Sequence, residues 1–375
     1  MEKIKILFMI PTLGQGGAEK VLVNLVNNLN KERFDVTVLA LFDGGVNKPF
    51  LKPWIKFRAC MPHTFRGNIH VLKIFSPGQL YKHFIREKYD IVVSYLEGPT
   101  ARIISGCSDE NTKMISWIHV EQHTRKEAAI SFRTEKEAEK CYSKFHKTIC
   151  VAETVKSDFC GIFPHVQECE VLYNTLESDQ IIKKSEETAV ELEEDGKIRL
   201  IAVGTLKETK AFDRLLRITK RLVEKGYNVH LYILGKGPLE DQFHQFIKDN
   251  NLLNNVTLLG YQMNPYKYIA RSDIFLCSSY REGFSTAATE ALILGVPVCT
   301  VEVSGMREML GDNNEYGIIT ENNEKALYQG IERLLDNPAL LAHYRKMATM
   351  RGKYFDTKQT VTAVEEMLEG MLKKE

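Results

Sequence analysis

The amino-acid sequence predicts an α/β protein made of two doubly wound domains, each built on a parallel sheet. Apolar runs of strand length alternate with helical segments in two series, and a polar, acidic stretch separates the series. Strands that are apolar throughout are typical of parallel sheets covered by helices on both faces. The length of 375 residues exceeds one usual domain and suits two.

The first series opens with an apolar strand, which is followed directly by a glycine-containing loop and a helix. Its predicted strands span 4–10, 36–42, 90–95, 114–118 and 148–151. Its predicted helices span 18–28, 134–144 and 153–160. The basic stretch between the second and third strands is predicted to be irregular.

The acidic segment 174–197 interrupts this rhythm and is predicted to be a surface linker with a solvated helix. The strands predicted after it span 198–204, 229–234, 256–259, 274–277 and 296–301. The helices predicted after it span 212–224, 239–249, 286–294, 339–351 and 361–373. We therefore expect a first domain at 1–173, a linker at 174–197, a second domain at 198–351 and a terminal helical segment at 352–375.

Composition and charge exclude several classes of protein. The net charge of +1 argues against a protein that binds nucleic acid through bulk electrostatics. The eight cysteines are scattered, without a Cys-x-x-Cys pair or paired Cys/His spacing, so we expect a reducing cytoplasm and no zinc site. The first strand begins too early for a signal peptide, and no apolar run approaches the length of a transmembrane helix.

The stretch that begins at Glu282 carries the strongest functional signal, and it reads EGFSTAATEALILGVPV. Glu290 follows Glu282 by eight positions, Thr286 can cap a short helix, and Gly295 and Pro297 end that helix near Leu294. The N-terminus of this helix directs unpaired N–H groups and its positive dipole end toward the loop that carries Glu282. Amides suit a diphosphate and carboxylates suit sugar hydroxyls, so the stretch predicts a site for a nucleotide-diphosphate sugar.

The two glutamates and their flanking residues resemble the signature of the retaining glycosyltransferases of family 4. The resemblance spans essentially the whole chain from Gly16 onward and is closest between Asn264 and Pro297. It implies the GT-B fold, in which two Rossmann-like domains face each other across a cleft and the C-terminal helix crosses back to the first domain. The first domain is then expected to bind the acceptor and the second domain the nucleotide sugar.

Residue by residue, the resemblance implies that Glu282 meets the donor sugar and that Glu290 binds the ribose. Lys210 matches the family's phosphate-binding lysine, whereas Thr205 stands where the family has arginine, which puts the strength of phosphate binding in doubt. The candidate donor-binding residues are Gly16, Gly17, Thr205, Lys210, Gly235, Tyr261, Gly283, Phe284, Ser285, Thr286 and Glu290. The candidate catalytic residues are Glu282, His119 and Lys210, and the candidate acceptor-binding residues are Glu97 and His119, which both follow predicted strands.

Basic and aromatic residues alternate from Lys48 to Lys88, in a chain that is otherwise nearly neutral. This composition suits an anionic membrane surface or a polyprenyl-diphosphate acceptor. The alternative is a solvated face that covers the core of the first domain.

These observations predict a cytoplasmic enzyme, peripheral on the inner face of the cell membrane. It would transfer a hexose or N-acetylhexosamine from a UDP-sugar to a polyprenyl-diphosphate-linked acceptor or a growing bacterial oligosaccharide. The sequence contains no Asp-x-Asp, so we expect no metal and no other cofactor. Two alternatives stay open: a UDP-sugar 2-epimerase of the same fold, and a catalytically silent partner subunit of a glycosyltransferase.

Overall fold

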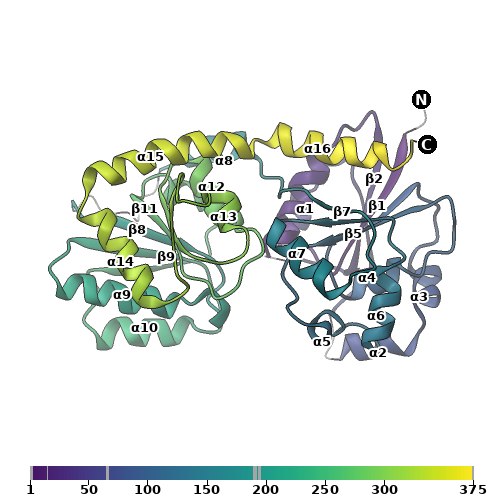
Figure 1. The fold of residues 1–375 in the computed structure, drawn as a ribbon, viewed down its shortest axis with the longest axis horizontal. Helices are drawn as coiled ribbons and strands as arrows, with labels where there is room; N and C mark the ends of the chain where they lie inside the picture. Colours follow the sequence, from purple (N-terminus) through teal and green to yellow (C-terminus); the bar gives the residue numbers. More distant parts are fainter. Residues whose placement is uncertain (1–2, 15, 65–66, 189–191, 193–195, 374–375) are drawn as a thin grey trace. The chain divides into compact units, whose positions relative to one another are not determined.

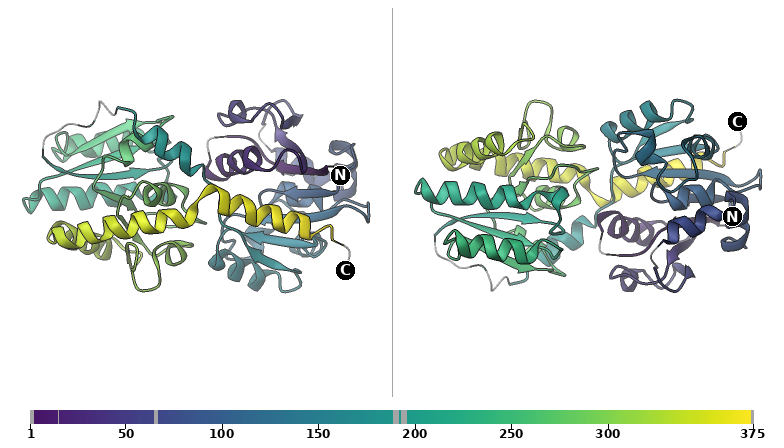
Figure 2. Two further views of the ribbon diagram at one scale, coloured as in Figure 1. Left: turned by 90° about the horizontal axis from the view of Figure 1, so that it is seen from above. Right: turned by 90° about the horizontal axis from the view of Figure 1, so that it is seen from below.

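The computed structural model describes residues 3–14, 16–64, 67–188, 192 and 196–373, and these divide into two compact units. The first unit comprises residues 1–176 together with 357–375, and the second comprises residues 177–356. Figure 1 labels the elements of both units. In both views of Figure 2, the strands of each unit lie between layers of helices.

The first unit contains a seven-stranded parallel sheet with the strand order β3-β2-β1-β4-β5-β6-β7. Its strands are β1 (Ile4–Ile10), β2 (Phe34–Phe42), β3 (Lys56–Met61), β4 (Ile91–Ser94), β5 (Lys113–Ile118), β6 (Lys147–Cys150) and β7 (Cys169–Val171). Its helices are α1 (Gly17–Asn28), α2 (Asn68–Ile74), α3 (Pro77–Phe84), α4 (Pro99–Ile104), α5 (Arg125–Ala128), α6 (Glu135–Tyr142), α7 (Glu153–Ile162) and α16 (Thr357–Gly370). The central strands are buried on both faces, as their unbroken apolar sequences predicted.

The prediction that the basic stretch is irregular was wrong. Within it, β3 forms the edge of the sheet beside β2, a short 3₁₀ helix spans Lys48–Phe50, and α2 and α3 follow. Half of the β3 side chains are exposed, because an edge strand has a partner on one side only, and this removes the continuous apolar pattern. Helix α3 is set by a capping box, in which Ser76 and Gln79 satisfy each other's backbone N–H groups.

The C-terminal helix α16 belongs to the first unit and lies alongside α1 (Figure 1). Arg33 Nη1 contacts Glu365 Oε2 at 2.8 Å, and the backbone N–H of Asn30 donates to Glu365 Oε1 at 2.6 Å. At the start of the helix, Thr357 Oγ1 donates to the carbonyl of Leu176 at 2.7 Å. The last helix of the chain is therefore held by Asn30 and Arg33 from the beginning of the chain and by Leu176.

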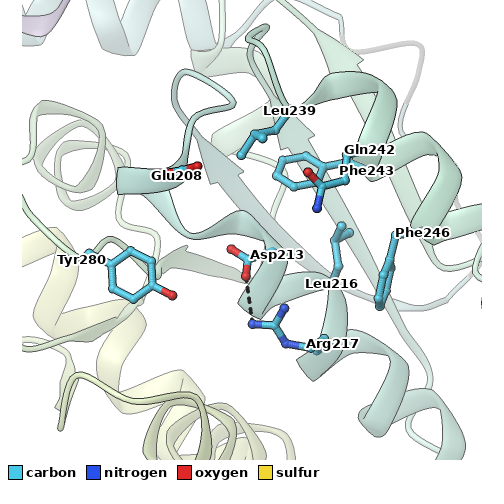
Figure 3. A pocket seen from close by; sticks show the side chains of 9 residues that line it. All are labelled: Glu208, Asp213, Leu216, Arg217, Leu239, Gln242, Phe243, Phe246 and Tyr280. Atoms are coloured by element: carbon cyan, nitrogen blue, oxygen red, sulfur yellow. Dashed lines mark ion pairs between the residues drawn. The ribbon is translucent and has the colours of Figure 1, made fainter.

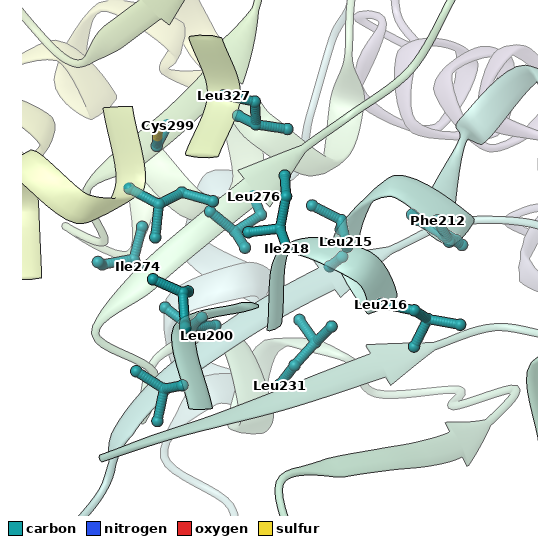
Figure 4. Packing of buried hydrophobic residues seen from close by; sticks show 14 of the residues in the cluster. Leu200, Phe212, Leu215, Leu216, Ile218, Leu231, Ile274, Leu276, Cys299 and Leu327 are labelled. Atoms are coloured by element: carbon teal, nitrogen blue, oxygen red, sulfur yellow. The ribbon is translucent and has the colours of Figure 1, made fainter. Parts of the chain in front are cut away.

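The second unit contains a six-stranded parallel sheet with the strand order β10-β9-β8-β11-β12-β13. Its strands are β8 (Ile198–Val203), β9 (Val229–Leu234), β10 (Val256–Gly260), β11 (Ile274–Cys277), β12 (Val298–Val301) and β13 (Ile318–Thr320). Its helices are α8 (Ser178–Ser185), α9 (Phe212–Glu224), α10 (Glu240–Asp249), α11 (Tyr266–Ile269), α12 (Thr286–Ile293), α13 (Met306–Leu310), α14 (Glu324–Leu335) and α15 (Pro338–Gly352). Figure 4 shows its core, where Leu200, Leu231 and Ile274 are fully buried together with residues of α9.

Part of the predicted linker is a structural element of the second unit. Helix α8 packs on α11 and α12, and it buries Ile181. Asn264 Nδ2 donates to the carbonyl of Lys184 at 2.8 Å, and Arg271 Nη1 donates to that of Ser185 at 2.9 Å. The units divide after residues 176 and 356, and residues 189–191 and 193–195 of the predicted linker lie outside the described residues.

Candidate active site

The first group of predicted site residues lies at the carboxyl edge of the second sheet, where β8 and β11 are neighbours. The strand order changes direction between them, and ligands of doubly wound sheets bind at such a point. The loops that leave these strands are joined, because the N–H of Tyr280 donates to the carbonyl of Thr209 at 2.9 Å. Ser278 Oγ also donates to the carbonyl of Lys210 at 2.9 Å. The two loops therefore hold each other in place.

Lys210 and Glu282 form an ion pair across these loops. Lys210 Nζ lies 2.6 Å from Glu282 Oε1, and the two side chains are only 23% and 11% exposed. Ser279 Oγ donates to the same carboxylate oxygen at 2.7 Å. Burial lowers the pKa of Lys210, but the attraction and hydrogen bond of Glu282 outweigh that effect, so the pKa lies above its ordinary value. The lysine is therefore held as a cation that faces a carboxylate.

Helix α12 begins directly after this pair, although its cap differs from the prediction. Ser285, and not Thr286, is the N-cap: its backbone is extended and its Oγ accepts from the N–H of Ala288 at 3.4 Å. Thr286 is the first helical residue. Glu290 lies in the second turn and is 3% exposed, so its carboxylate is buried inside the unit. The helix ends as expected, with Gly295 in the left-handed conformation at φ +69°.

The neighbouring strand ends approach one another so closely that one glycine is obligatory. Gly235 follows β9 with φ +143°, and a Cβ at this position would lie 1.8 Å from the carbonyl oxygen of Gly204. The N–H of Gly235 donates to the carbonyl of Gly260 at 2.8 Å, which joins the end of β10 to the same edge. Tyr261 follows at once and is 46% exposed. The backbone carbonyl of Thr205 accepts a hydrogen bond from the N–H of Lys207 at 2.8 Å. The threonine side chain brings no positive charge to this edge.

Gly283 and Phe284 connect the ion pair to the rest of the unit. The carbonyl of Gly283 lies beside Gly305, where a Cβ would come within 2.8 Å of it. Phe284 is buried, and its ring meets that of Phe355 edge-on at 5.7 Å. These contacts fix the loop between Glu282 and α12.

The second unit also contains a pocket of about 380 Å³ (Figure 3). Glu208 and Tyr280 line this pocket, whereas Lys210 and Glu282 line a separate small cavity. Asp213 and Arg217, two of its lining residues, form an ion pair at 2.9 Å. Its remaining lining residues are Leu216, Leu239, Gln242, Phe243 and Phe246. None of the predicted site residues lines this pocket.

In the first unit, Glu97 and His119 lie together at the carboxyl ends of β4 and β5. The backbone N–H of His119 donates to Glu97 Oε2 at 3.0 Å, and the Tyr95 ring lies 4.9 Å from the imidazole. Burial lowers the pKa of His119 to about 3, and His119 Nε2 has no hydrogen-bond partner among the described residues. Burial also raises the pKa of Glu97, partly offset by the hydrogen bond from His119. Burial therefore keeps the imidazole neutral.

Gly16 and Gly17 lie where the loop after β1 enters α1. Gly16 is the N-cap, Gly17 is the first helical residue, and both are exposed. The loop after β2 packs against the loop that leads to these glycines, because the N–H of Asn47 donates to the carbonyl of Leu13 at 3.0 Å. Gly45, at φ +116°, lies so close to Leu13 that a Cβ on it would clash with the Leu13 carbonyl. The glycines therefore present backbone N–H groups at the carboxyl edge of the first sheet.

The structure brings together Lys210 with Glu282 and Glu97 with His119. It also identifies residues that sequence reasoning missed, above all Ser279, which holds the Glu282 carboxylate. The sequence could have indicated Ser279, because it is a polar residue that follows the predicted strand β11 by two positions. Asp158 of α7 was missed as well: its carboxylate accepts from the N–H groups of Gln122, at 2.6 Å, and of His123, and only the tertiary contact identifies it.

The part of the chain that the structure describes offers neither a metal cluster nor a membrane-spanning helix. No group of three or more His, Cys, Asp or Glu side chains is arranged there to hold a metal ion. None of the helices in the same residues combines the length and apolar character needed to span a membrane.

Comparison with known structures identifies the fold. A structure of Anabaena HepE in complex with UDP and glucose superimposes with a TM-score of 0.80 at 17% identity, and covers 98% of this chain and 99% of that one. Sucrose-phosphate synthase from Thermosynechococcus elongatus gives 0.81 at 15% identity, with 98% and 99% coverage. The chain therefore has the GT-B fold that the resemblance implied.

Sequence comparison identifies the family. An N-acetylgalactosamine-N,N'-diacetylbacillosaminyl-diphospho-undecaprenol 4-alpha-N-acetylgalactosaminyltransferase of Campylobacter jejuni is 36% identical over 192 residues, which span 51% of this chain and 50% of that protein. An uncharacterized glycosyltransferase of Methanocaldococcus jannaschii is 25% identical over 91% of this chain and 90% of its own length. The model of Glycosyltransferase Family 4 matches residues 15–180, and that of Glycosyl transferases group 1 matches residues 183–351. Since the two matches together account for both units, the chain belongs to the family 4 type of glycosyltransferases.

Proposed function

We propose that this glycosyltransferase is a retaining enzyme, which moves a hexose or N-acetylhexosamine from a UDP-sugar to a lipid-linked or growing bacterial surface glycan. The observation that carries the proposal is the Lys210–Glu282 ion pair at the carboxyl edge of the second sheet, directly before α12. A buried pair of this kind keeps a cation and a carboxylate charged and in position for a ligand that carries both phosphates and hydroxyls.

In the proposed complex, the donor separates the pair. The Lys210 ammonium turns to the diphosphate, and the N–H groups at the start of α12 add their positive end. Glu282 turns to the hydroxyls of the sugar, where its charge stabilises the positive charge that develops on the sugar ring as the bond breaks. The leaving phosphate takes the proton of the acceptor hydroxyl on the same face. Charge on the diphosphate is then met by this chain's own residues, without a metal.

Glu290 completes the proposed donor site within the second unit. The buried Glu290 carboxylate would accept hydrogen bonds from the ribose hydroxyls. In the first unit, the neutral His119 would exchange a hydrogen bond with a hydroxyl of the acceptor, and Glu97 would orient its backbone. Since Thr205 removes one cation, Lys210 carries more of the phosphate charge than in the family pattern.

The names of related proteins support this donor and this acceptor. The Campylobacter relative is named for a diphospho-undecaprenol acceptor, and HepE was crystallised with UDP and glucose. A poly(ribitol-phosphate) alpha-N-acetylglucosaminyltransferase of Staphylococcus aureus is 28% identical over 39% of this chain and 30% of its own length. These names favour transfer to a glycan or its lipid carrier over the epimerase alternative.

We also propose that the enzyme works peripherally on the cytoplasmic face of the membrane, with a docking surface narrower than the whole basic stretch. Ion pairs neutralise several of its charges, since Lys48 pairs with Asp43, Lys56 with Asp35 and Arg58 with Glu87. Three exposed apolar residues, Val71, Ile74 and Phe75, lie instead in α2 and directly after it. The backbone at the end of α2 binds Arg133, whose Nη2 donates to the carbonyl of Ile74 at 2.6 Å, which adds a cation to this surface.

Incubation with labelled UDP-sugars and a membrane extract tests the proposed reaction. Transfer of label into extractable lipid or glycan supports the proposal, and epimerisation of the free sugar nucleotide supports the first alternative. If neither product forms, the result supports a catalytically silent subunit.

The ribose assignment has its own test. Glu290→Ala should weaken the binding of UDP by about 1.5–3 kcal/mol, the usual contribution of charge-assisted hydrogen bonds. The matched control is Glu224→Ala at the exposed end of α9, which should leave the UDP affinity unchanged. Calorimetry that gives equal affinities for Glu290→Ala and the wild type refutes the ribose assignment.

A further inference from the structure

Three cysteines that are spaced ten and nine residues apart in the sequence meet in the first unit, and none of them is a predicted site residue. Cys150 ends β6, Cys160 lies in the last turns of α7, and Cys169 begins β7. The Cys160 and Cys169 sulfurs are 2.8 Å apart, and Cys150 makes a side-chain hydrogen bond to Cys169. All three are free thiols, and Cys160 and Cys169 are partly exposed.

The pairing of β6 with β7 and the packing of α7 bring the three cysteines together. In the parallel pairing of β6 and β7, Cys169 lies opposite Thr148 and Cys150 lies opposite Val171, so the two cysteines are diagonal neighbours. Helix α7 connects the two strands and packs on both of them, which brings Cys160 over the start of β7. A disulfide between Cys160 and Cys169 would close a short loop and require the sulfurs to approach by about 0.8 Å from 2.8 Å.

The electrostatic surroundings make Cys169 the thiol that ionises first. Hydrogen bonds from Cys150 and Cys160, together with the nearby Lys156 ammonium, lower the pKa of Cys169 in spite of its burial. The hydrogen bond to Cys169 and burial raise the pKa of Cys150. Burial and the contact with Cys169 raise the pKa of Cys160. Of the three thiols, Cys169 therefore loses its proton most easily, and its sulfur is partly exposed.

We propose that these cysteines form a thiol–disulfide exchange site, at which Cys169 is the attacking thiolate and Cys160 is the resolving thiol. The Cys169 sulfur attacks one sulfur of a small-molecule disulfide, forms a mixed disulfide and releases one thiolate. Cys160 then loses its proton and attacks the Cys169 sulfur, which forms the Cys160–Cys169 bond and releases the second thiol. In balance, two protein thiols are oxidised and one small-molecule disulfide is reduced to two thiols.

The second step follows from the first. Formation of the mixed disulfide removes the negative charge on Cys169, and this charge is part of what keeps Cys160 protonated. Cys160 then ionises more easily, beside the sulfur that it must attack. Cys150 is buried at the end of β6 and keeps its role as hydrogen-bond donor. The inference is independent of the proposed transfer reaction, because none of these residues belongs to that site.

The test treats the full-length native protein with oxidised glutathione, traps the remaining thiols by alkylation and maps the peptides by mass spectrometry. Of the eight cysteines, two should be consumed, so six alkylated thiols should remain, with the bridge between Cys160 and Cys169. Cys160→Ser should stop at one glutathione attached to Cys169, and Cys169→Ser should yield neither product. The matched control Cys107→Ser, another partly exposed cysteine, should form the bridge as the wild type does.

A second measurement follows the alkylation rate of Cys169 as a function of pH. Its midpoint should lie below the ordinary thiol value of about 8.5 and should rise in Cys150→Ala, which removes a donor to the thiolate. An ordinary midpoint in the wild type overturns the proposal. So does a bridge through Cys150 instead of Cys160, or a wild-type protein that keeps eight alkylated thiols after treatment.

Discussion

Glu282→Gln replaces the carboxylate of the central ion pair by a neutral amide of nearly the same shape. In the wild type, Lys210 Nζ lies 2.6 Å from the carboxylate, and the lysine side chain is 23% exposed. The variant keeps an oxygen that can accept a hydrogen bond from Lys210, but it leaves the ammonium group in a largely buried place without a countercharge.

The loss of one partner from a buried ion pair usually costs about 3–5 kcal/mol, because the other charge stays buried without compensation. The residual exposure of Lys210 and the remaining hydrogen bond reduce this cost. We therefore expect the free energy of unfolding of the second unit to fall by about 2–3 kcal/mol, or roughly 5–10 °C in its thermal midpoint.

The pH dependence should change as well. In the wild type the folded pKa of Lys210 is raised, so the contribution of the pair is fully present below about pH 10.4 and is lost as the pH rises through the folded pKa. In the variant, burial is no longer opposed by Glu282, so the folded pKa falls below the unfolded value. The folded variant then binds fewer protons than the unfolded chain, and its stability should rise with pH where the stability of the wild type does not.

Activity should separate from stability in the double variant. Glu282→Gln should lower turnover on the order of 10²–10³ while sparing UDP binding, since the proposed partner of Glu282 is the sugar. Adding Lys210→Met removes the uncompensated charge and should restore much of the stability, but none of the activity. Glu302→Gln is the matched control: it breaks an exposed pair with Arg307 in the same unit and should cost no more than about 1 kcal/mol. Glu282→Gln with wild-type stability and wild-type turnover would refute the reasoning.

Three further predictions concern other parts of the chain. Thr205→Arg restores the cation of the family pattern and should raise the affinity for UDP by about 1 kcal/mol or more in calorimetry, whereas Lys207→Arg, one exposed cation for another, should not. Gly235→Ala places a Cβ against the carbonyl of Gly204 at φ +143° and should cost about 3 kcal/mol or more in urea unfolding, while Gly226→Ala, also at positive φ but in open space, should cost less. Ile74→Glu combined with Phe75→Ser should reduce sedimentation with anionic liposomes several-fold without changing UDP affinity, and Leu253→Glu, which changes a similarly exposed residue of the second unit, should leave sedimentation unchanged. Wild-type protein that does not sediment at low salt would refute the docking surface.

The sequence alone predicted the two parallel sheets, because each central strand is apolar along its whole length. The prediction of Glu282 and Lys210 as site residues came from the resemblance of their motifs to the family 4 signature. The structure shows an ion pair between them that the sequence did not predict, and their roles stay predictions. The order of the strands could not be predicted, because each strand has the same local pattern and the pairing depends on packing between distant segments.

Only the tertiary structure decided what the charges and thiols of the first unit do. The basic stretch appeared to be a continuous positive surface, but Lys56 and Arg58 of β3 pair with Asp35 and Glu87, which lie 21 and 29 residues away. The three cysteines appeared to be scattered, and the connection of β6, α7 and β7 brings them within contact. Hydrophobic periodicity states which face of an element is buried. It does not state which element covers that face, so pairings between polar groups of different elements are determined by the folded chain.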